Sequence, residues 1–304
     1  MSYAFDPELA PWVELIPRPD LSDVGRAREL ARQLAAQRPP VPVPGNVTVA
    51  DADAAGVPVR IYTPADRPVP HPALLYLHGG GFVTGSVESG HEEALHRAAD
   101  LGIVTVSVDY RLAPEHPFPA GLEDSYAALE WTADHAGELG IDPGRIAVGG
   151  DSAGGGLAAS LTQLVRARRG PAIRFQYLGI PELDDRLDTP SMLAFHDTPL
   201  WNRPLAELSW TYYLGDVTEL DGVPAAPARA GDLTGLPPAF VAVCEFDPLR
   251  DEGLRYAQRL LADGVTVELH LYPGTFHGCA LARDAAVTRR MAADADAALR
   301  RALG

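Results

Sequence analysis

Apolar residues along this chain gather in short runs, and several of the segments between them carry apolar residues at helical spacing. Short apolar runs are typical of strands buried on both faces of a parallel sheet, and the helices between them are the connections that such a sheet needs. The pattern predicts an α/β fold with a mostly parallel central sheet flanked by helices. The strand candidates are residues 73–77, 103–108, 145–149, 240–244 and 267–272.

The chain before the first of these core strands has a different pattern. Ser22 and Asp23 precede a helical pattern at 24–37, and the proline-rich stretch 38–45 predicts an extended linker. Residues 47–62 hold two short strand patterns around Gly56, which predicts an antiparallel pair at the edge of the sheet.

The alternation of strands and helices breaks at residues 183–227, where aromatic residues gather on a helix-like stretch. These aromatic residues are Trp201, Trp210, Tyr212 and Tyr213. We therefore expect N-terminal helices and a linker at 1–45, an α/β domain at 46–182 and 228–304, and an insertion at 183–227.

Composition excludes several classes of protein. The 304 residues, 46% of them hydrophobic, are enough for one large core. A net charge of −16 argues against nucleic-acid and membrane partners, because both would repel the chain. Residues 1–14 lack the basic and apolar parts of a secretory signal, and no stretch of about 18 residues stays apolar. We expect a soluble, cytoplasmic protein, and the use of arginine for every basic residue suggests a high-GC bacterial genome.

The most informative motif is the sequence Gly-Asp-Ser-Ala-Gly at residues 150–154. It follows a strand candidate and opens an Ala- and Leu-rich helical stretch, as in a nucleophile elbow, where small residues permit a tight turn that exposes the serine hydroxyl. The start of the following helix favours developing negative charge. The motif therefore predicts Ser152 as a nucleophile, against the alternative of a structural turn serine.

A second motif, His-Gly-Gly-Gly-Phe at 78–82, follows the strand candidate 73–77. Bare glycine amides after a strand fit a loop that stabilises the oxyanion of acyl transfer, although three glycines alone could form a flexible turn. We expect the amides of Gly80, Gly81 and Ala153 to form an oxyanion hole. His78 is more consistent with a residue that positions this loop than with a base.

Together with three further motifs, these residues resemble the hormone-sensitive-lipase-like branch of the α/β-hydrolases, the bacterial carboxylesterases of the HGGG/GDSAG type. The further motifs are the segments 109–115 (DYRLAPE), 247–253 (DPLRDEG) and 277–278 (HG). The resemblance covers most of the chain in the family's order, and it implies that residues 1–45 and 183–227 form a cap over the serine. Cys279 departs from the pattern, because such enzymes commonly carry an aromatic residue there.

An α/β-hydrolase supplies its nucleophile, acid and base in that order from loops after successive strands. Asp247 follows the strand candidate 240–244, and His277 follows the candidate 267–272, with room for a helix at 251–263 between them. His277 would take the serine proton, and Asp247 would orient and stabilise the imidazole. Among the neighbouring acids, Asp247 matches the family motif, and His196 is the alternative base. These alternative acids are Glu245, Asp251 and Glu252.

Two other sets of residues have weaker signals. The apolar side chains of the insertion are candidates for a substrate pocket, although aromatic residues at helical spacing are more often core. They are Phe195, Leu200, Trp201, Trp210 and Tyr213. Arg111 and Glu115 are expected to tie down the oxyanion loop, and Asp151 to support the elbow. Cys244 and Cys279 form neither a zinc pattern nor a disulfide framework, so we expect two buried thiols.

The residues predict a serine carboxylesterase that forms an acyl-enzyme on Ser152, uses no metal or cofactor, and acts on short- to medium-chain esters and water. An apolar pocket discriminates weakly between chain lengths, which favours a broad acyl preference. The alternatives are an amide hydrolase of the arylformamidase kind and, from another class, a non-catalytic small-molecule receptor, which would typically have lost a triad residue. Exposed sheet edges would permit a homodimer.

Overall fold

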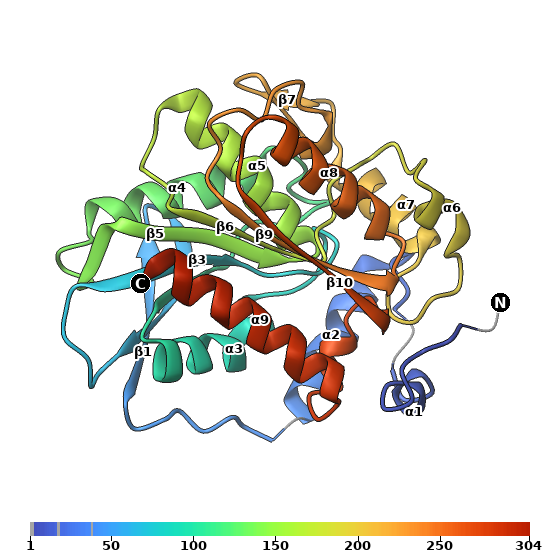
Figure 1. The fold of residues 1–304 in the computed structure, drawn as a ribbon, viewed down its shortest axis with the longest axis horizontal. Coiled ribbons are helices and arrows are strands. Elements are labelled where there is room, and N and C mark those ends of the chain that lie inside the picture. The colour runs from blue at the N-terminus through green and yellow to red at the C-terminus, as the bar shows by residue number, and fades with distance from the viewer. Residues whose placement is uncertain (1–2, 17–18, 38) are drawn as a thin grey trace.

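A central eight-stranded sheet organises the fold (Figure 1). A computed structural model describes residues 3–16, 19–37 and 39–304. Within them the strand order is β1-β2-β4-β3-β5-β6-β9-β10, in which β1–β2 and β2–β4 pair antiparallel and the other pairs are parallel. The strands are β1 (Val47–Ala54), β2 (Val57–Pro64), β3 (His71–Leu77), β4 (Val104–Val108), β5 (Ile141–Asp151), β6 (Phe175–Gly179), β9 (Ala239–Phe246) and β10 (Val267–Phe276). A separate hairpin joins β7 (Glu219–Leu220) to β8 (Val223–Pro224).

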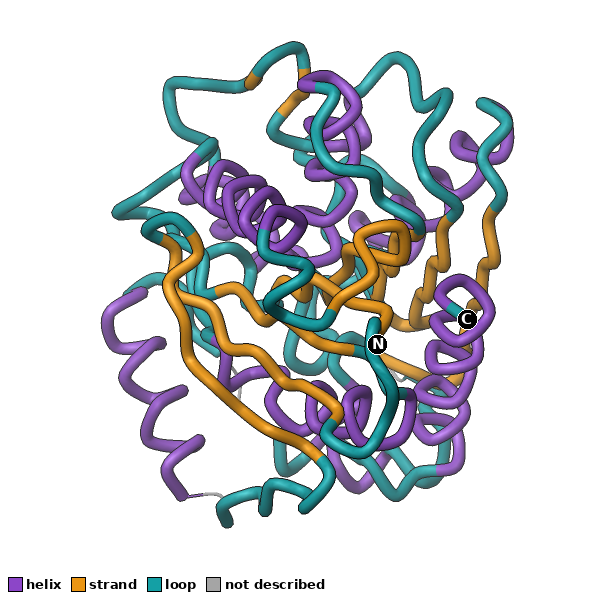
Figure 2. Tube along the Cα trace, turned by 90° about the vertical axis from the view of Figure 1, so that its left-hand side faces the viewer, coloured by secondary structure: helices purple, strands orange, loops and turns teal. Residues whose placement is uncertain are grey.

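Helices cover both faces of this sheet (Figures 1 and 2). Helices α4, α5 and α8 pack on one face, and α9 packs on the other, where α3 also lies. The α-helices are α1 (Ala10–Val13), α2 (Val24–Gln37), α3 (His91–His96), α4 (Ala120–Asp134), α5 (Ala153–Arg168), α6 (Pro190–Ala194), α7 (Arg203–Tyr213), α8 (Arg250–Ala262) and α9 (Ala286–Leu303). Short helical turns are η1 (Val87–Gly90), η2 (Arg97–Leu101), η3 (Pro227–Arg229) and η4 (Cys279–Leu281). In the described residues no helix is long and apolar enough to cross a bilayer.

The central strands are buried because both of their faces meet helices. Every residue of β4 and of β6 is buried, and all but one residue of β3 are buried as well. Two apolar cores follow, one on each side of the sheet, and they contain residues from alternate positions of the same strands, such as Leu75 and Leu74 of β3. The predicted α/β fold with a mostly parallel sheet is confirmed.

Most predicted elements are present, with a few differences at their ends. The helix at 24–37 and the antiparallel pair around Gly56 are as predicted. Strand β10 runs on to Phe276, through residues that the sequence assigned to a loop, after an irregular register beyond Tyr272. The predicted helix-like stretch does not include Trp201, because α7 begins at Arg203, after the N-cap Asn202 and before a proline at a first-turn position.

The N-terminal segment packs against the insertion and against the loop after β3. A small apolar cluster joins Leu21 to Val83, Trp201 and Leu205. The hydroxyl of Tyr212 in α7 donates a 3.1 Å hydrogen bond to the carbonyl oxygen of Leu21. Two segments far apart in the sequence thus meet over the loop that carries the three glycines.

Candidate active site

Ser152 lies at a sharp turn between β5 and α5. Its backbone has φ 59° and ψ −123°, a strained conformation for a residue with a side chain. The flanking glycines are required by close packing, because a Cβ atom at either Gly150 or Gly154 would collide with the carbonyl oxygen of Leu77 in β3. The turn is fastened by a 2.8 Å hydrogen bond from the Ser152 amide to the carbonyl oxygen of Gly179. Motif, strain and packing thus agree with a nucleophile elbow.

The side chains of Ser152, His277 and Asp247 form a continuous hydrogen-bonded line. His277 Nε2 lies 2.9 Å from Ser152 Oγ, and His277 Nδ1 lies 2.7 Å from Asp247 Oδ2. All three residues are buried, with Ser152 the most exposed at 7%. An Nδ1–H that donates to the carboxylate leaves Nε2 free to accept the serine proton, which is the arrangement that general-base activation needs.

Asp247 is the only one of the four predicted acid candidates that contacts His277 in the described residues. Its other carboxyl oxygen accepts a 2.9 Å hydrogen bond from the Leu249 amide, which sets the orientation of the side chain. Glu245 accepts a hydrogen bond from the Gly274 amide, whereas Asp251 and Glu252 face the insertion. Asp247 is thus hydrogen-bonded to the imidazole, whereas the three neighbouring acids have other hydrogen-bond partners.

The glycine loop after β3 lies close to the elbow. A Cβ atom at Gly79 would lie 2.9 Å from the Asp151 carbonyl oxygen and 3.4 Å from Ser152 Cβ. Gly80 and Gly81 both have positive φ, 125° and 57°, and the carbonyl oxygen of Gly80 accepts hydrogen bonds from the Val83 and Thr84 amides. In the described part of the chain the amides of Gly80 and Gly81 donate no hydrogen bond, which their predicted role as oxyanion donors requires.

Ser209 of α7 holds the same loop from the insertion. Its hydroxyl donates a 2.9 Å hydrogen bond to the carbonyl oxygen of Gly81, and both of these residues are buried. His78 stacks on Tyr110 with ring centroids 4.2 Å apart, and the Tyr110 hydroxyl donates to the His78 carbonyl oxygen. These contacts agree with the predicted positioning role of His78.

Arg111 and Glu115, which were predicted to hold the oxyanion loop in place, have different partners. Arg111 pairs with Asp124 at the start of α4, so it fastens its own loop to that helix rather than to the glycines. Glu115 pairs with Arg28 of α2 at 2.8 Å. Arg28 also donates to the carbonyl oxygens of Val83 and Ala113, which links the N-terminal helix to the end of the glycine loop.

Asp151, the residue before the proposed nucleophile, accepts hydrogen bonds from two tyrosines. The hydroxyls of Tyr76 and Tyr177 donate to its two carboxyl oxygens at 2.7 and 2.9 Å. Arg97 stacks over both rings, with its guanidinium carbon 4.8 Å from the Tyr76 centroid and 5.7 Å from that of Tyr177. Burial raises the pKa of Asp151, and the tyrosine hydroxyls and the Arg97 charge oppose the rise. Asp151 is therefore anchored to β3 and β6 by these two hydrogen bonds, directly before Ser152 in the chain.

A second acid, Glu182, lies beside the elbow. It is fully buried, and neither carboxyl oxygen has a hydrogen-bond partner among the described residues. Burial is the main cause that raises the pKa of Glu182 to about 8, the Asp247 charge adds to the rise, and the nearby Ser209 hydroxyl opposes it in part. Glu182 is thus mostly a neutral carboxylic acid at pH 7.

The five pocket candidates separate into two groups. Leu200 and Trp201 adjoin the triad and the glycine loop: the Trp201 ring lies 5.8 Å from the His277 ring, a Cβ atom at Gly81 would lie 2.5 Å from its Cη2 atom, and one at Gly278 would collide with Leu200. The other three pack in aromatic clusters, Trp210 and Tyr213 against Phe82, and Phe195 against Tyr3 and Phe246. Pocket lining by these side chains stays a prediction.

The other residues considered from the sequence make no hydrogen bond to the proposed triad in the described part of the chain. The His196 ring contacts the carbonyl oxygen of Leu193. Cys244 and Cys279 are buried and unbridged, as predicted. Among the described residues no group of three or more His, Cys, Asp or Glu side chains could hold a metal ion.

Three residues that support the site were missed from the sequence: Arg28, Glu182 and Ser209. Each acts through a partner that is distant along the chain, and none belongs to a recognisable motif. The sequence contains a signal for Glu182 alone, because an acidic residue in the apolar segment directly after β6 is unusual.

Comparisons with known proteins agree with this geometry. The sequence model of a family described as having the alpha/beta hydrolase fold matches residues 74–281. Carboxylesterase NlhH of Mycobacterium tuberculosis is 44% identical over 226 residues, which cover 73% of this chain and 70% of that protein. Esterase LipI of the same species is 40% identical over 284 residues, 90% of this chain and 88% of the relative.

A solved structure covers nearly the whole chain. The structure of a bacterial heroin esterase superposes with a TM-score of 0.93 at 48% identity, and the match covers 99% of this chain and 98% of that one. The two proteins therefore share their fold over nearly their whole length, including the region of the candidate site.

Proposed function

This chain belongs to the hormone-sensitive-lipase-like branch of the α/β-hydrolase fold family, and we propose that it is a serine carboxylesterase whose acyl-enzyme forms on Ser152. The observation that carries the proposal is the buried line from Ser152 Oγ through His277 to Asp247, with distances of 2.9 and 2.7 Å. Its relatives are named as carboxylesterases and esterases, which supports ester hydrolysis as the reaction.

In the first half of the reaction His277 Nε2 takes the Ser152 proton while Oγ attacks the ester carbonyl carbon. The carbonyl oxygen becomes negatively charged, and the amides of Gly80, Gly81 and Ala153 stabilise it. The intermediate collapses, the His277 imidazolium gives its proton to the leaving alkoxide, and an alcohol departs. Asp247 stabilises the imidazolium throughout without taking its proton.

In the second half water hydrolyses the acyl-enzyme. His277 takes a proton from the water, the hydroxide attacks the acyl carbon, and the same amides stabilise the new oxyanion. Collapse of this intermediate breaks the bond to Ser152 Oγ, which recovers its proton from His277, and a carboxylic acid leaves. No group outside the chain and its water is needed for either step.

We further propose that residues 1–45 and 183–227 form a cap and that the substrate is an ester of a short- to medium-chain acid. The contacts of Leu200 and Trp201 with Gly278 and Gly81 support this, since bulky side chains already lie close to the reacting groups and leave less room for a long acyl chain.

The test is hydrolysis of p-nitrophenyl esters of increasing acyl length by the wild type and by Ser152→Ala, with an anilide of the best acyl group in parallel. Ester turnover that the substitution abolishes, with little anilide cleavage, is expected. Preferred cleavage of the anilide would instead identify an amide hydrolase. Absence of turnover on every substrate would favour a small-molecule receptor.

A further inference from the structure

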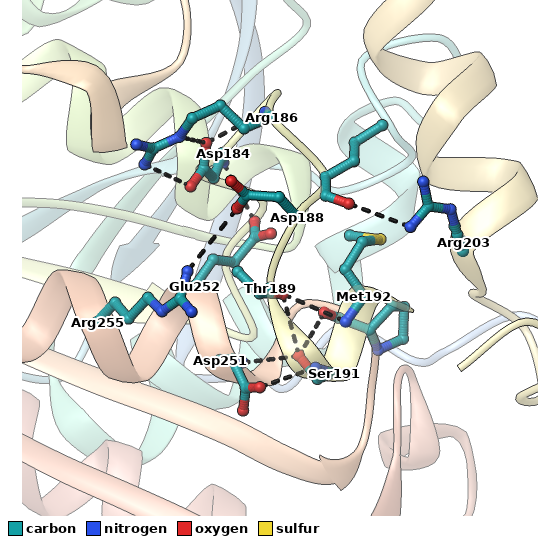
Figure 3. Close-up of polar contacts among 12 residues, drawn as sticks. Asp184, Arg186, Asp188, Thr189, Ser191, Met192, Arg203, Asp251, Glu252 and Arg255 are labelled. Carbon is teal, nitrogen blue, oxygen red and sulfur yellow. Dashed lines mark hydrogen bonds and ion pairs between the residues drawn. The ribbon is translucent and has the colours of Figure 1, made fainter. Parts of the chain in front are cut away.

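The insertion grips the turn that carries Asp247 through one buried serine. Ser191 belongs to the short helix α6 and is fully buried. Its hydroxyl donates a 2.8 Å hydrogen bond to the Pro248 carbonyl oxygen and accepts one of 3.0 Å from the Asp251 amide. Figure 3 shows Ser191 and Asp251 facing each other at the contact between the insertion and helix α8.

Asp251 returns the contact with its side chain. One carboxyl oxygen accepts a 2.8 Å hydrogen bond from the Ser191 amide, and the other accepts one of 2.8 Å from Arg250 Nε. Burial alone would raise the pKa of Asp251, but the Arg250 guanidinium and the Ser191 amide lower it below its usual value. The carboxylate is therefore ionised at neutral pH, and its hydrogen bonds are of the stronger, charge-assisted kind.

The gripped turn transmits its position to Asp247 over a short distance. The Arg250 amide donates a 3.1 Å hydrogen bond to the Asp247 carbonyl oxygen, and the Leu249 amide donates to its carboxylate. Pro248, between them, has a restricted backbone. A displacement of Pro248 or Asp251 would thus move the Asp247 side chain as well.

A neighbouring contact fastens the start of the insertion to the same helix. One carboxyl oxygen of Glu252 accepts hydrogen bonds from the Leu183 and Asp184 amides, at 2.6 and 3.3 Å. One turn further along α8, Arg255 forms an ion pair with Asp188, with 3.8 Å between Nη1 and Oδ1 (Figure 3). The first turns of α8 therefore anchor both ends of the segment that leads to Ser191.

We propose that Ser191 and Asp251 are positioning residues that hold the Asp247 turn against the insertion, so that the orientation of the His277 imidazole depends on a residue outside the α/β core. This inference rests on the proposed function, because it takes Asp247 as the acid that orients His277. The catalytic consequence is large for a small movement, since a misplacement of about 1 Å at a reacting group can cost about 100-fold in rate.

The test compares Ser191→Ala with Ser125→Ala. Ser125 is an equally buried serine of α4 whose hydroxyl donates within its own helix, to the Gly121 carbonyl oxygen at 2.7 Å. Both variants lose one buried hydroxyl, but only the first loses the contact with the acid turn. We would measure kcat and KM for p-nitrophenyl butyrate from pH 5 to 9, with the active enzyme counted by titration with a p-nitrophenyl phosphonate, which phosphonylates the serine and releases p-nitrophenol.

We expect Ser191→Ala to lower kcat about tenfold with KM within about twofold, and to move the acidic limb of the kcat/KM profile to lower pH, because the imidazolium is then less stabilised. Asp251→Asn should move the acidic limb of the kcat/KM profile in the same direction. Ser191→Thr, which keeps the hydroxyl, should have the profile of the wild type. Ser125→Ala should change only the melting temperature.

Equal kcat and equal pH profiles for the Ser191→Ala and Ser125→Ala enzymes would overturn the inference, whatever their melting temperatures. The variant Asp247→Asn separates this from a failure of the proposed function. If Asp247→Asn retains full activity, the proposed triad is wrong. If Asp247→Asn is inactive while Ser191→Ala matches its control, the triad stands and the positioning role falls.

Discussion

The backbone amide of Glu182 donates a 3.0 Å hydrogen bond to the carbonyl oxygen of Ser152. A buried acid is thereby fastened directly to the residue proposed as nucleophile, and the Gly156 amide donates to the same carbonyl oxygen at 3.0 Å. Because the Glu182 carboxyl is not paired with any base among the described residues, its ionisation has consequences for the fold around the site.

Glu182→Gln should stabilise the protein increasingly as pH rises. The pKa of Glu182 is raised from 4.5 to about 8, so between these values the folded state holds a proton that the unfolded state has lost. The free energy of unfolding of the wild type therefore falls as pH rises through this window, and the glutamine variant escapes the loss. The difference should grow to the order of 3 kcal/mol by pH 8 and then level off.

Urea unfolding at pH 5, 6.5 and 8 measures this difference. Glu138→Gln is the control, because Glu138 lies exposed in the turn after α4 and the same substitution there should change stability little at any pH. A constant difference between the Glu182→Gln and wild-type proteins across this range would show that Glu182 does not titrate as described.

Asp247→Asn should lower kcat by about 1,000- to 10,000-fold while the protein stays folded. An amide of the same shape can donate to His277 Nδ1, which would hold the imidazole in the tautomer that cannot accept the serine proton. Steady-state kinetics with a p-nitrophenyl ester measures the loss. Glu245→Gln, which keeps an acceptor for the Gly274 amide, should remain active, and the reverse result would transfer the role of the acid to Glu245.

Ser209→Ala should slow catalysis by loosening the glycine loop. The hydroxyl holds the Gly81 carbonyl oxygen at 2.9 Å, and the Gly81 amide is a proposed oxyanion donor. We expect kcat to fall about tenfold, less than the roughly 100-fold cost of losing a donor outright, with a smaller change in KM. Ser125→Ala is the matched variant, since the Ser125 hydroxyl is equally buried and donates only to Gly121 of its own helix. Equal kinetics for the two variants would exclude the role assigned to Ser209.

Gly154→Ala should destabilise the fold severely. The added methyl group would collide with the carbonyl oxygens of Leu77 and His78, which belong to the backbone of β3 and its loop and cannot move aside. The expected loss is more than about 3 kcal/mol, seen as a large fall in melting temperature or as insoluble protein. Gly137→Ala is the control, because nothing lies within 4 Å of a Cβ atom there. A Gly154→Ala protein as stable as this control would contradict the packing described for the elbow.

Local patterns in the sequence were sufficient for the fold class and for the proposed serine and histidine. Strands buried on both faces read as continuous apolar runs, and a nucleophile elbow needs small residues at fixed positions, so both leave a signature within a few neighbouring residues. Ser152 was found in this way. Asp247 and His277 followed because loops after parallel strands meet at one edge of the sheet, and the family resemblance selected Asp247 among its acidic neighbours.

The ends of elements were harder to predict where local and tertiary preferences differ. Pro273 and Gly274 favour a loop, yet the chain continues as strand β10 to Phe276 beside β9. Trp201 has the spacing of the helical aromatics, but the N-cap at Asn202 starts α7 after it. The end of β10 is set by its pairing with β9, and the start of α7 is set by the N-cap Asn202. The spacing of hydrophobic residues predicts neither of these.

The sequence by itself determined the α/β fold and led to the proposed serine and base, because these depend on short-range patterns and on strand order, while the family resemblance selected the proposed acid. Only the tertiary structure decided what holds them in place: Ser191 on the turn of Asp247, Ser209 on Gly81, and Glu182 on Ser152. Each of these contacts consists of one to three hydrogen bonds between residues that are distant along the chain. Such pairs exist only once the chain is folded, and no local periodicity of polar and apolar residues records them.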